Sequence, residues 1–344
     1  MTKKKAAPPS KKTVYLSDFH MTDEASFSAK PYPYGKMTAT QAQRVASFLA
    51  WVGQRPKEFE RVVLLGDIVD LWTVPHCCTP PTVESIIQAK QNAPIMKVLP
   101  LLMEAGIKVV YTQGNHDNGT ALDDFGRYVK GIELDNQYCP VESPICAEHG
   151  HHRCLFNGTD PRMRPSLGEF IARASATSTM KTGKGFPSEA AMLIKNREEL
   201  VEIPKIGLVT CVWDAVVKEA KLKPTDVFVD PKFPNPWSVD GVGKAYYNLY
   251  YEFGEGVDSV LCEFDPYYGA FEEGETIYIA GHSHNHVFGT YFNGTLVYIN
   301  TGAWCCDNEC YFAVTWKEGG ATWASLQKWT SSGPKPVNAA SVQP

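Results

Sequence analysis

The sequence lacks any long apolar run and any leader-like segment. None of its 344 residues falls in a stretch that approaches the roughly 18 apolar residues of a membrane-spanning helix. The basic start, MTKKKAAPPSKK, is followed by no apolar core, so it does not have the pattern of a secretory signal. We therefore expect residues 1–12 to form a disordered basic tail, no transmembrane segment, and a cytoplasmic protein whose thiols stay reduced.

Zinc-finger and disulfide-scaffold patterns are also missing. Ten cysteines are too few for a disulfide framework in a chain of this length. Two clusters occur, His76-Cys77-Cys78 and Cys305-Cys306 with Cys310, and neither has zinc-finger spacing. Buried or half-buried thiols are the favoured interpretation, and a metal or redox role is the alternative.

No excess of positive charge marks the chain as a duplex-binding protein. The net charge is −5, and no long basic stripe is present. This balance argues against duplex nucleic acid but leaves short or single-stranded substrates open. The apolar fraction of 44% and the charged fraction of 21% are typical of a globular protein.

Three apolar runs each end abruptly in polar residues: 13–16, 61–65 and 107–112. A helical pattern with a cap-like Thr38 fills 38–53, and a second helix, complicated by two prolines, is expected over 82–105. This β-α-β-α-β order predicts parallel strands. The carboxyl ends of such strands share one edge of the sheet, where ligands bind.

The end of the sequence reads as antiparallel sheet. Strand-like runs flank Asn293-Gly294 and again Gly319-Gly320, which are hairpin signals. The long segment 158–275 carries few motifs and interrupts the polar clusters. We expect a core of residues 13–157 and 276–330, an inserted cap at 158–275 over the active site, and a flexible tail at 331–344.

Short polar motifs follow the strand-like runs in a fixed order. They supply carboxylates, imidazoles and one amide oxygen, a mixture that suits manganese, iron, zinc or nickel and not calcium. If the backbone stays extended, side chains two residues apart point to the same side. Each motif alone is weak, but together they predict a metal site. The motifs are Asp18-Phe19-His20, Gly66-Asp67-Ile68-Val69-Asp70, Gly114-Asn115-His116-Asp117, His149-Gly150-His151 and Gly281-His282-Ser283-His284.

This order resembles that of the calcineurin-like metallophosphoesterase superfamily, whose pattern is D-x-H, G-D-x-x-D, G-N-H-[DE], a later H, and G-H-x-H. The resemblance covers about 13–157 and 276–304. It implies a four-layer α/β/β/α sandwich with mixed sheets and two divalent transition-metal ions, of which Mn, Fe, Zn and Ni are candidates. It assigns Asp18, His20, Asp67 and His284 to one ion and Asp67, Asn115, His149 and His282 to the other. Asp67 would bridge the ions through its two oxygens.

The resemblance also implies phosphoester hydrolysis, in which a hydroxide between the ions attacks phosphorus in line. His116 would act as general acid or electrostatic stabiliser, oriented and kept protonated by Asp70. Asp117 is left with a structural role. His151 and His286 could lie behind the ligands or be solvated loop residues, and His76 could touch substrate or be an ordinary loop residue.

The segment GDIVDLW is similar to that of the UDP-2,3-diacylglucosamine pyrophosphohydrolases, but His116 stands where those enzymes have Arg. We therefore expect a small or medium phosphoester as substrate. A nucleotide-sugar or lipid pyrophosphohydrolase and a nuclease are alternatives, and a non-catalytic scaffold is the least favoured. Arg153, Arg162, Arg164 and the aromatic stretch 237–251 could contact substrate or simply be parts of a packed cap. The sequence leaves the oligomeric state open.

Overall fold

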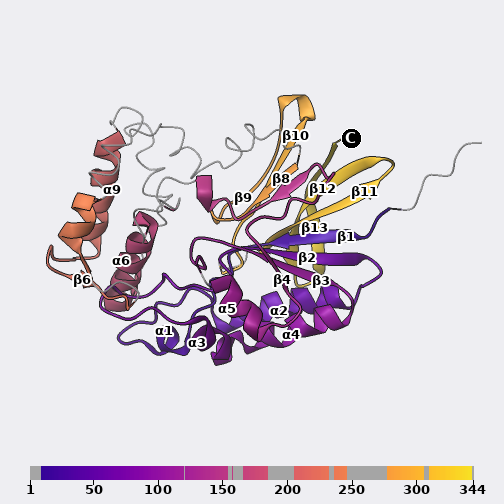
Figure 1. The fold of residues 1–344 in the computed structure, drawn as a ribbon. Coiled ribbons are helices and arrows are strands. Elements are labelled where there is room, and N and C mark those ends of the chain that lie inside the picture. The colour runs from indigo at the N-terminus through magenta and orange to yellow at the C-terminus, as the bar shows by residue number, and fades with distance from the viewer. Residues whose placement is uncertain are drawn as a thin grey trace, which may run out of the picture.

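Two mixed β-sheets form the centre of the computed structural model (Figure 1). It describes residues 9–119, 121–153, 157, 166–184, 205–231, 236–245, 277–305 and 310–342. The first sheet has the strand order β13-β12-β11-β1-β2-β3-β4, and the second has the order β5-β8-β10-β9. The predicted mixed α/β fold with two mixed sheets is thus confirmed. The helical layer that was predicted on the outer face of the second sheet is not tested by the described residues.

The first sheet joins a parallel half to an antiparallel half. Neighbours from β1 to β4 run parallel, whereas β11, β12 and β13 pair antiparallel with each other and with β1. The strands are β1 (Lys12–Leu16), β2 (Phe59–Leu65), β3 (Lys108–Thr112), β4 (Glu133–Asp135), β11 (Tyr311–Glu318), β12 (Ala321–Thr330) and β13 (Gly333–Val342).

Strand β13 corrects the prediction of a flexible tail at 331–344. It pairs along its length with β12, in a register that sets Trp329 opposite Pro334 and Gln327 opposite Pro336. The two prolines cannot donate to a strand ladder. β13 lies at the sheet edge, where missing donors are tolerated.

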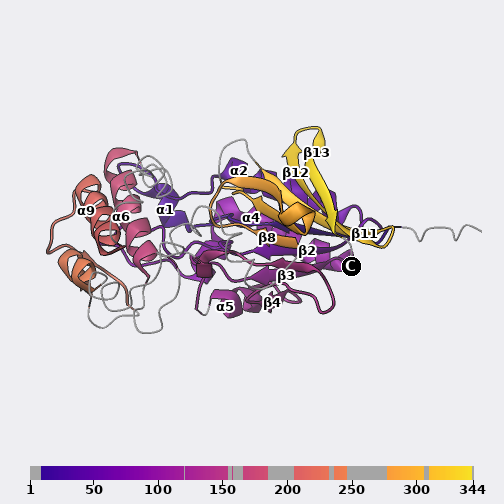
Figure 2. The ribbon, with the colours of Figure 1, turned by 90° about the horizontal axis from the view of Figure 1, so that it is seen from above.

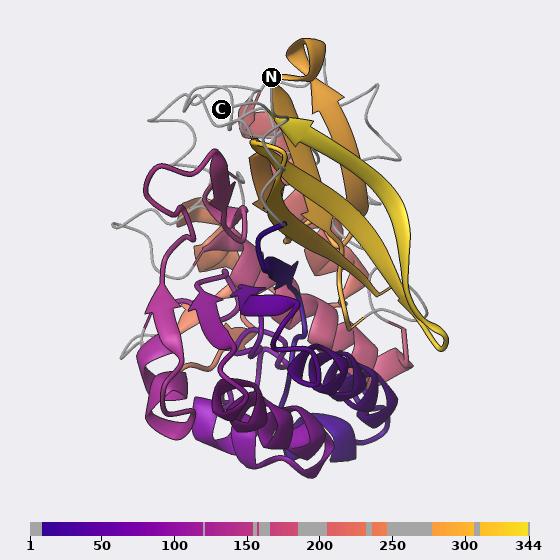
Figure 3. The same ribbon diagram turned by 90° about the vertical axis from the view of Figure 1, so that its right-hand side faces the viewer.

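Helices cover one face of the first sheet (Figure 3). The helix predicted over 38–53 is α2, and a capping box between Thr38 and Gln41 fixes its start. The single helix predicted over 82–105 is wrong in its continuity: a 3₁₀ turn, Lys90–Asn92, separates α3 from α4. Pro94 lies in the first turn of α4, where its missing N–H has no partner to lose, so it starts a new helix. The helices are α1 (Glu24–Ser28), α2 (Ala39–Gly53), α3 (Val83–Gln88), α4 (Ala93–Glu104) and α5 (Ala121–Tyr128).

The second sheet contains both parallel and antiparallel pairs. β5 (Ile145–Ala147), β8 (Ile277–Ala280) and β10 (Leu296–Thr301) run parallel, and β9 (His286–Tyr291) pairs antiparallel with β10. The predicted hairpins are confirmed: a turn at Phe292–Gly294 joins β9 to β10, and Gly319-Gly320 joins β11 to β12. Both turns contain positive φ angles, which Asn and Gly adopt at low cost.

Alternating side chains along the central strands build two separate cores. Val62 and Leu64 of β2 face the helices, whereas Val63 and Leu65 face the second sheet. On that side they pack in one cluster with residues of β5, β8 and β10 such as Ile279. The sheets are therefore fixed face to face, and the ends of β1, β2, β3, β5, β8 and β10 lead into a common region.

Part of the predicted insertion forms a helical unit beside the sandwich, at the end away from β13 (Figures 1 and 2). It contains α6 (Leu167–Thr182), α9 (Lys205–Glu219) and the short pair β6 (Val227–Phe228) and β7 (Trp237–Ser238). The buried Arg173 of α6 donates to the carbonyls of Cys78 and Val229 at 2.8 and 2.7 Å. That this unit covers an active site remains a prediction.

One disulfide departs from the expectation of reduced thiols. Cys139 and Cys146 are bridged, because a local antiparallel bridge between Tyr138 and Ala147 brings their backbones together. Sequence spacing alone gave no sign of this pairing. Among the described helices, none is long and apolar enough to cross a membrane.

Candidate metal centre

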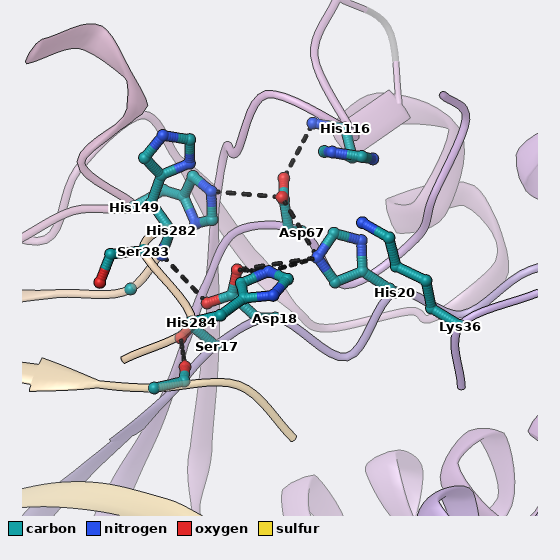
Figure 4. A network of polar contacts seen from close by, with 12 residues as sticks. Ser17, Asp18, His20, Lys36, Asp67, His116, His149, His282, Ser283 and His284 are labelled. Carbon is teal, nitrogen blue, oxygen red and sulfur yellow. Dashed lines mark hydrogen bonds and ion pairs between the residues drawn. The ribbon is translucent and has the colours of Figure 1, made fainter. Parts of the chain in front are cut away.

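The candidate ligands stand on sharply turned backbone just beyond the strand ends. Asp18, His20, Asp67, His282 and His284 have φ between 49° and 70°, a region that L residues rarely adopt. The condition of an extended backbone across D-x-H and H-x-H is therefore not met, because left-handed residues reverse the chain there. The side chains still converge (Figure 4), and strain of this kind is typical of functional sites.

Glycines allow the loops to approach each other. A Cβ on Gly114 would collide with the carboxylate of Asp67, and one on Gly281 would collide with Ser17 and Asp18. These glycines therefore precede the ligand residues for a steric reason, since any larger residue would displace a carboxylate.

Asp117 holds two of these loops together. Its carboxylate accepts hydrogen bonds from the backbone N–H groups of Ile68 at 2.8 Å and Gly114 at 2.5 Å, and from the hydroxyl of Tyr111 at 2.5 Å. Burial and the charge of Asp67 raise the pKa of Asp117 to about 7. These contacts agree with the structural role expected from the sequence.

One cluster contains the four side chains assigned to the first ion. His20 Nε2 lies 3.0 Å from His284 Nε2, 3.6 Å from Asp67 Oδ2 and 3.8 Å from Asp18 Oδ1. His284 Nε2 lies 3.2 Å from Asp18 Oδ1. Asp18 and His20 are fully buried.

A second cluster adjoins the first through Asp67. His149 Nε2 lies 3.0 Å from Asn115 Oδ1 and 3.3 Å from Asp67 Oδ2. The His282 ring packs edge-on against that of His149, with centroids 5.1 Å apart. The structure thus brings together all seven predicted ligands, Asp18, His20, Asp67, Asn115, His149, His282 and His284.

Hydrogen bonding fixes the tautomers of two rings and leaves acceptors facing acceptors. His149 Nδ1 must donate to the Leu65 carbonyl at 2.8 Å, so Nε2 of the neutral ring is a lone pair aimed at the oxygens of Asn115 and Asp67. His20 Nδ1 bonds Asp70 at 2.8 Å, so its Nε2 likewise faces His284 and Asp67. Such an arrangement needs a cation between the acceptors, so these residues fit divalent metal ions.

The protonation of His149 also indicates that a positive charge is needed between these acceptors. Burial acts to lower the pKa of His149, but the carboxylates of Asp67 and Asp18 outweigh it and raise the pKa to about 10. In the metal-free protein a proton therefore takes the place of the cation. Groups that could hold an ion include Asp18, Asp67 and His149, whose ligand atoms lie within 4.8 Å of one another.

The two oxygens of Asp67 have different surroundings. Its Oδ1 accepts the backbone N–H of His116 at 2.8 Å. Its Oδ2 faces both His20 and His149. Asp67 therefore adjoins both clusters, and its carboxylate is the group that would be shared by the two ions.

His116 lies against the first cluster: a nitrogen of its ring, a carboxylate oxygen of Asp67 and a ring nitrogen of His20 all lie within 4.8 Å of one another. Its Nδ1 bonds Asp70 Oδ1 at 2.7 Å, its ring packs edge-on against His20, and Trp72 lies over it with centroids 4.8 Å apart. The predicted orientation by Asp70 is therefore present. Asp70 was also expected to keep the ring protonated, but in the metal-free protein burial lowers the pKa of His116 to about 4 although Asp70 acts to raise it.

Several residues of the site carried no recognisable motif. Cys305 lies with His20 and His284, and the Lys36 ammonium is 3.9 Å from Asp70 Oδ2. Asn157 Nδ2 lies 3.4 Å from His282 Nε2. The only sequence signal among them was the cysteine cluster around Cys305, because isolated Lys and Asn residues have no spacing to recognise.

The remaining histidines and arginines have different surroundings. His151 is buried, and within the described part of the chain neither of its ring nitrogens has a hydrogen-bond partner. Its ring lies 5.5 Å from that of His149, whereas His286 stacks on Tyr311 at 3.7 Å. His76 is buried against Thr177 of the insertion. Arg153 ends a short 3₁₀ turn, while Arg162, Arg164 and 246–251 lie outside the described residues.

No protein-family model matches this chain, and no curated protein matches it. Solved structures do. An archaeal phosphodiesterase is 11% identical over 89% of this chain and 98% of its own, with a TM-score of 0.34. Phosphoesterases are thus among the structural neighbours of this chain. A predicted phosphoesterase from Streptococcus pneumoniae is 12% identical over 95% and 97%, with a TM-score of 0.32. Zinc-complexed Vps29 from Entamoeba histolytica is 9% identical over 96% and 98%, with a TM-score of 0.33. Likeness at this level concerns the fold and not the activity.

Proposed function

We propose that this protein is a dinuclear metal-dependent hydrolase of phosphoesters. The observation that carries the proposal is Asp67 Oδ2, which has His20 on one side and His149 on the other, each turning its Nε2 toward this oxygen. Two acceptor clusters that share one carboxylate oxygen suit a pair of ions. Two such ions about 3.5–4 Å apart would activate water and neutralise the charge of a phosphoryl group.

The protein's own residues prepare the site before substrate arrives. Asp70 and the Leu65 carbonyl hold His20 and His149 in the tautomer that a ligand needs. The Asp67 carboxylate is fixed by the His116 backbone N–H at 2.8 Å. These side chains therefore need to move little during the reaction. Such preorganisation allows polar groups to stabilise the charge of a transition state.

His116 is proposed to act on the leaving oxygen. Its Nδ1 is engaged by Asp70, which leaves Nε2 to address the substrate. Because burial lowers the pKa of His116 to about 4, the ring is neutral near pH 7 in the free protein. An anionic phosphoester beside it would favour proton uptake, and the ring would then donate to the leaving group.

The substrate class is a small or medium phosphomonoester or phosphodiester. His116 is the residue that favours this class over the lipid pyrophosphate reading, where Arg occupies the equivalent place. A nuclease acting on single strands is the second enzymatic candidate, since the net charge of −5 disfavours only the duplex. A non-catalytic scaffold is opposed by the presence of all seven predicted ligands, of which Asp18, His20, Asp67, Asn115 and His149 are buried.

A panel of substrates tests the proposal. Metal-free protein is reconstituted with Mn²⁺, Zn²⁺, Fe²⁺ or Ni²⁺ and offered aryl monoesters, aryl diesters, nucleotides, cyclic nucleotides, oligonucleotides and UDP-sugars. Metal-dependent release from a monoester or diester is the expected result. A single strong hit on a UDP-diacyl sugar would favour the lipid alternative, and bound metal without turnover of any substrate would favour the scaffold.

A further inference from the structure

A thiol stands in the first cluster. Cys305 offers one ligand atom, its sulfur, to a group completed by ring nitrogens of His20 and His284, and all of these atoms lie within 4.8 Å of one another. The cysteine is 7% exposed and takes no part in the disulfide. Nothing in the sequence pattern of the ligand motifs includes this position.

The backbone around Cys305 is fixed to the ligand loop itself. The N–H groups of Trp304 and Cys305 both donate to the carbonyl of Asp18 at 3.1 Å. Gln41 of α2 donates to the carbonyl of Cys305 at 2.5 Å. Trp304 is fully buried, and its indole donates to the Tyr311 carbonyl at 2.7 Å. These four hydrogen bonds fix the turn after β10, and this turn places the sulfur beside a candidate ligand.

A separate observation points to a cation at the same place. Asp18 Oδ1 is fully buried and has no hydrogen-bond partner among the described residues. It lies 3.2 Å from His284 Nε2 and 3.8 Å from His20 Nε2, the side chains that surround the thiol. A buried carboxylate oxygen without a donor costs free energy unless a cation neutralises it.

We propose that Cys305 supplies a thiolate ligand to the ion held by His20 and His284, which makes this a site for thiophilic divalent ions such as Zn²⁺, Fe²⁺ or Co²⁺. The inference rests on the metal centre of the proposed function. Imidazole and thiolate donors suit these ions, whereas Mn²⁺ and Mg²⁺ prefer oxygen. The second cluster contains the amide oxygen of Asn115 and no described thiol, so it is the site better suited to ions that prefer oxygen ligands.

A packing role is the competing explanation, because Cys305 also belongs to the core against α2. Packing alone would be served by any small apolar residue and predicts no spectroscopic effect of the sulfur. Coordination predicts a metal–sulfur signal that disappears with this sulfur and with no other. The two explanations are therefore separable in the full-length protein.

Cobalt titration provides the test. Metal-free protein is titrated with Co²⁺, and the near-ultraviolet charge-transfer band of a cobalt–thiolate bond is recorded together with the number of ions bound. The wild type and the controls Cys310→Ser, Cys306→Ser and Cys77→Ser/Cys78→Ser should show the band. Cys305→Ser should lose it, still bind cobalt, and weaken zinc binding about 10–100-fold while changing manganese binding far less.

A measurement on the unmodified protein guards against a variant that does not fold. X-ray absorption of the zinc-loaded wild type should show a sulfur scatterer at about 2.3 Å. Bound metal without a sulfur signal, or a signal lost in a control variant and kept in Cys305→Ser, would overturn the thiolate assignment and leave the proposed function standing. Failure of the wild type to bind any divalent metal would overturn both.

Discussion

Nδ1 of His116 lies 2.7 Å from Oδ1 of Asp70, and this contact determines which ring nitrogen remains available for chemistry. The other oxygen of the same carboxylate accepts from His20 Nδ1 at 2.8 Å and from the Thr73 hydroxyl at 2.6 Å. Burial opposes ionisation of Asp70. The ring of His116 and the hydrogen bonds that the Asp70 carboxylate accepts nevertheless hold the pKa of Asp70 well below the usual range. One anion therefore orients both a candidate ligand and the candidate acid.

Replacing His116 with alanine should separate metal binding from catalysis. The Nδ1 of the ring is engaged by Asp70, which is not a predicted ligand, so metal content should match that of the wild type. Turnover of an alkyl phosphate ester should fall about 10²–10⁴-fold, with a smaller loss on aryl esters, whose leaving groups need no proton. Steady-state kinetics with metal analysis checks this, and His152→Ala, at an exposed histidine, is the control. Near-normal turnover of the alkyl ester would contradict the role given to His116.

Asp70→Asn should damage both functions of the shared carboxylate. Loss of the charge behind His20 should weaken metal binding about 10–100-fold, and turnover at saturating metal should still be reduced because His116 loses its orientation. Metal titration and kcat at saturating metal measure the two effects separately. Thr73→Val, which removes only one donor to Asp70, should show little of either. A loss of kcat without weaker metal binding would show that Asp70 does not support His20.

Metal binding should release protons. The pKa of His149 is raised to about 10 in the metal-free protein, so the ring is protonated at pH 8 and must lose that proton to become a ligand. Affinity for Mn²⁺ should therefore increase with pH up to about 10. Calorimetry at pH 8 in two buffers of different ionisation enthalpy should find at least one proton released per protein. Proton-neutral binding would place the metal away from His149.

Stability of the metal-free protein should depend on Asp117. Its pKa is raised from 3.8 to about 7, so the stabilisation from its protonation is complete below about pH 4 and is lost as the pH rises through 7. Asp117→Asn lacks this dependence. Its loss of unfolding free energy relative to wild type, measured by urea denaturation with chelator present, should be largest near pH 5 and smaller at pH 8. If the loss of unfolding free energy in Asp117→Asn instead grew with pH, a raised pKa of Asp117 would be contradicted.

Much of this site was predictable because its chemistry depends on residue type and order. Strand-like runs followed by polar motifs located Asp18, Asp67 and Asn115 at one sheet edge, since parallel strands end together. The hairpins around Asn293 and Gly319 were predictable for a similar local reason.

What could not be predicted depends on three-dimensional surroundings. Left-handed backbone at His20 cannot be read from a residue type that rarely adopts it. The low pKa of His116 is set by burial, which no spacing reveals. Lys36 and Cys305 reach the site from loops without a motif, and Pro334 and Pro336 concealed an edge strand.

The left-handed backbone of the ligand positions has an evolutionary consequence. At Asp18, His20, Asp67, His282 and His284 the positive φ that disfavours the native residue is one that glycine adopts freely. A mutation to glycine there would remove a ligand and at the same time relieve backbone strain. The proposed activity could thus be lost at these positions without a matching loss of stability. A lineage with this fold could pass from enzyme to binding protein in single steps, each of which leaves a chain that still folds.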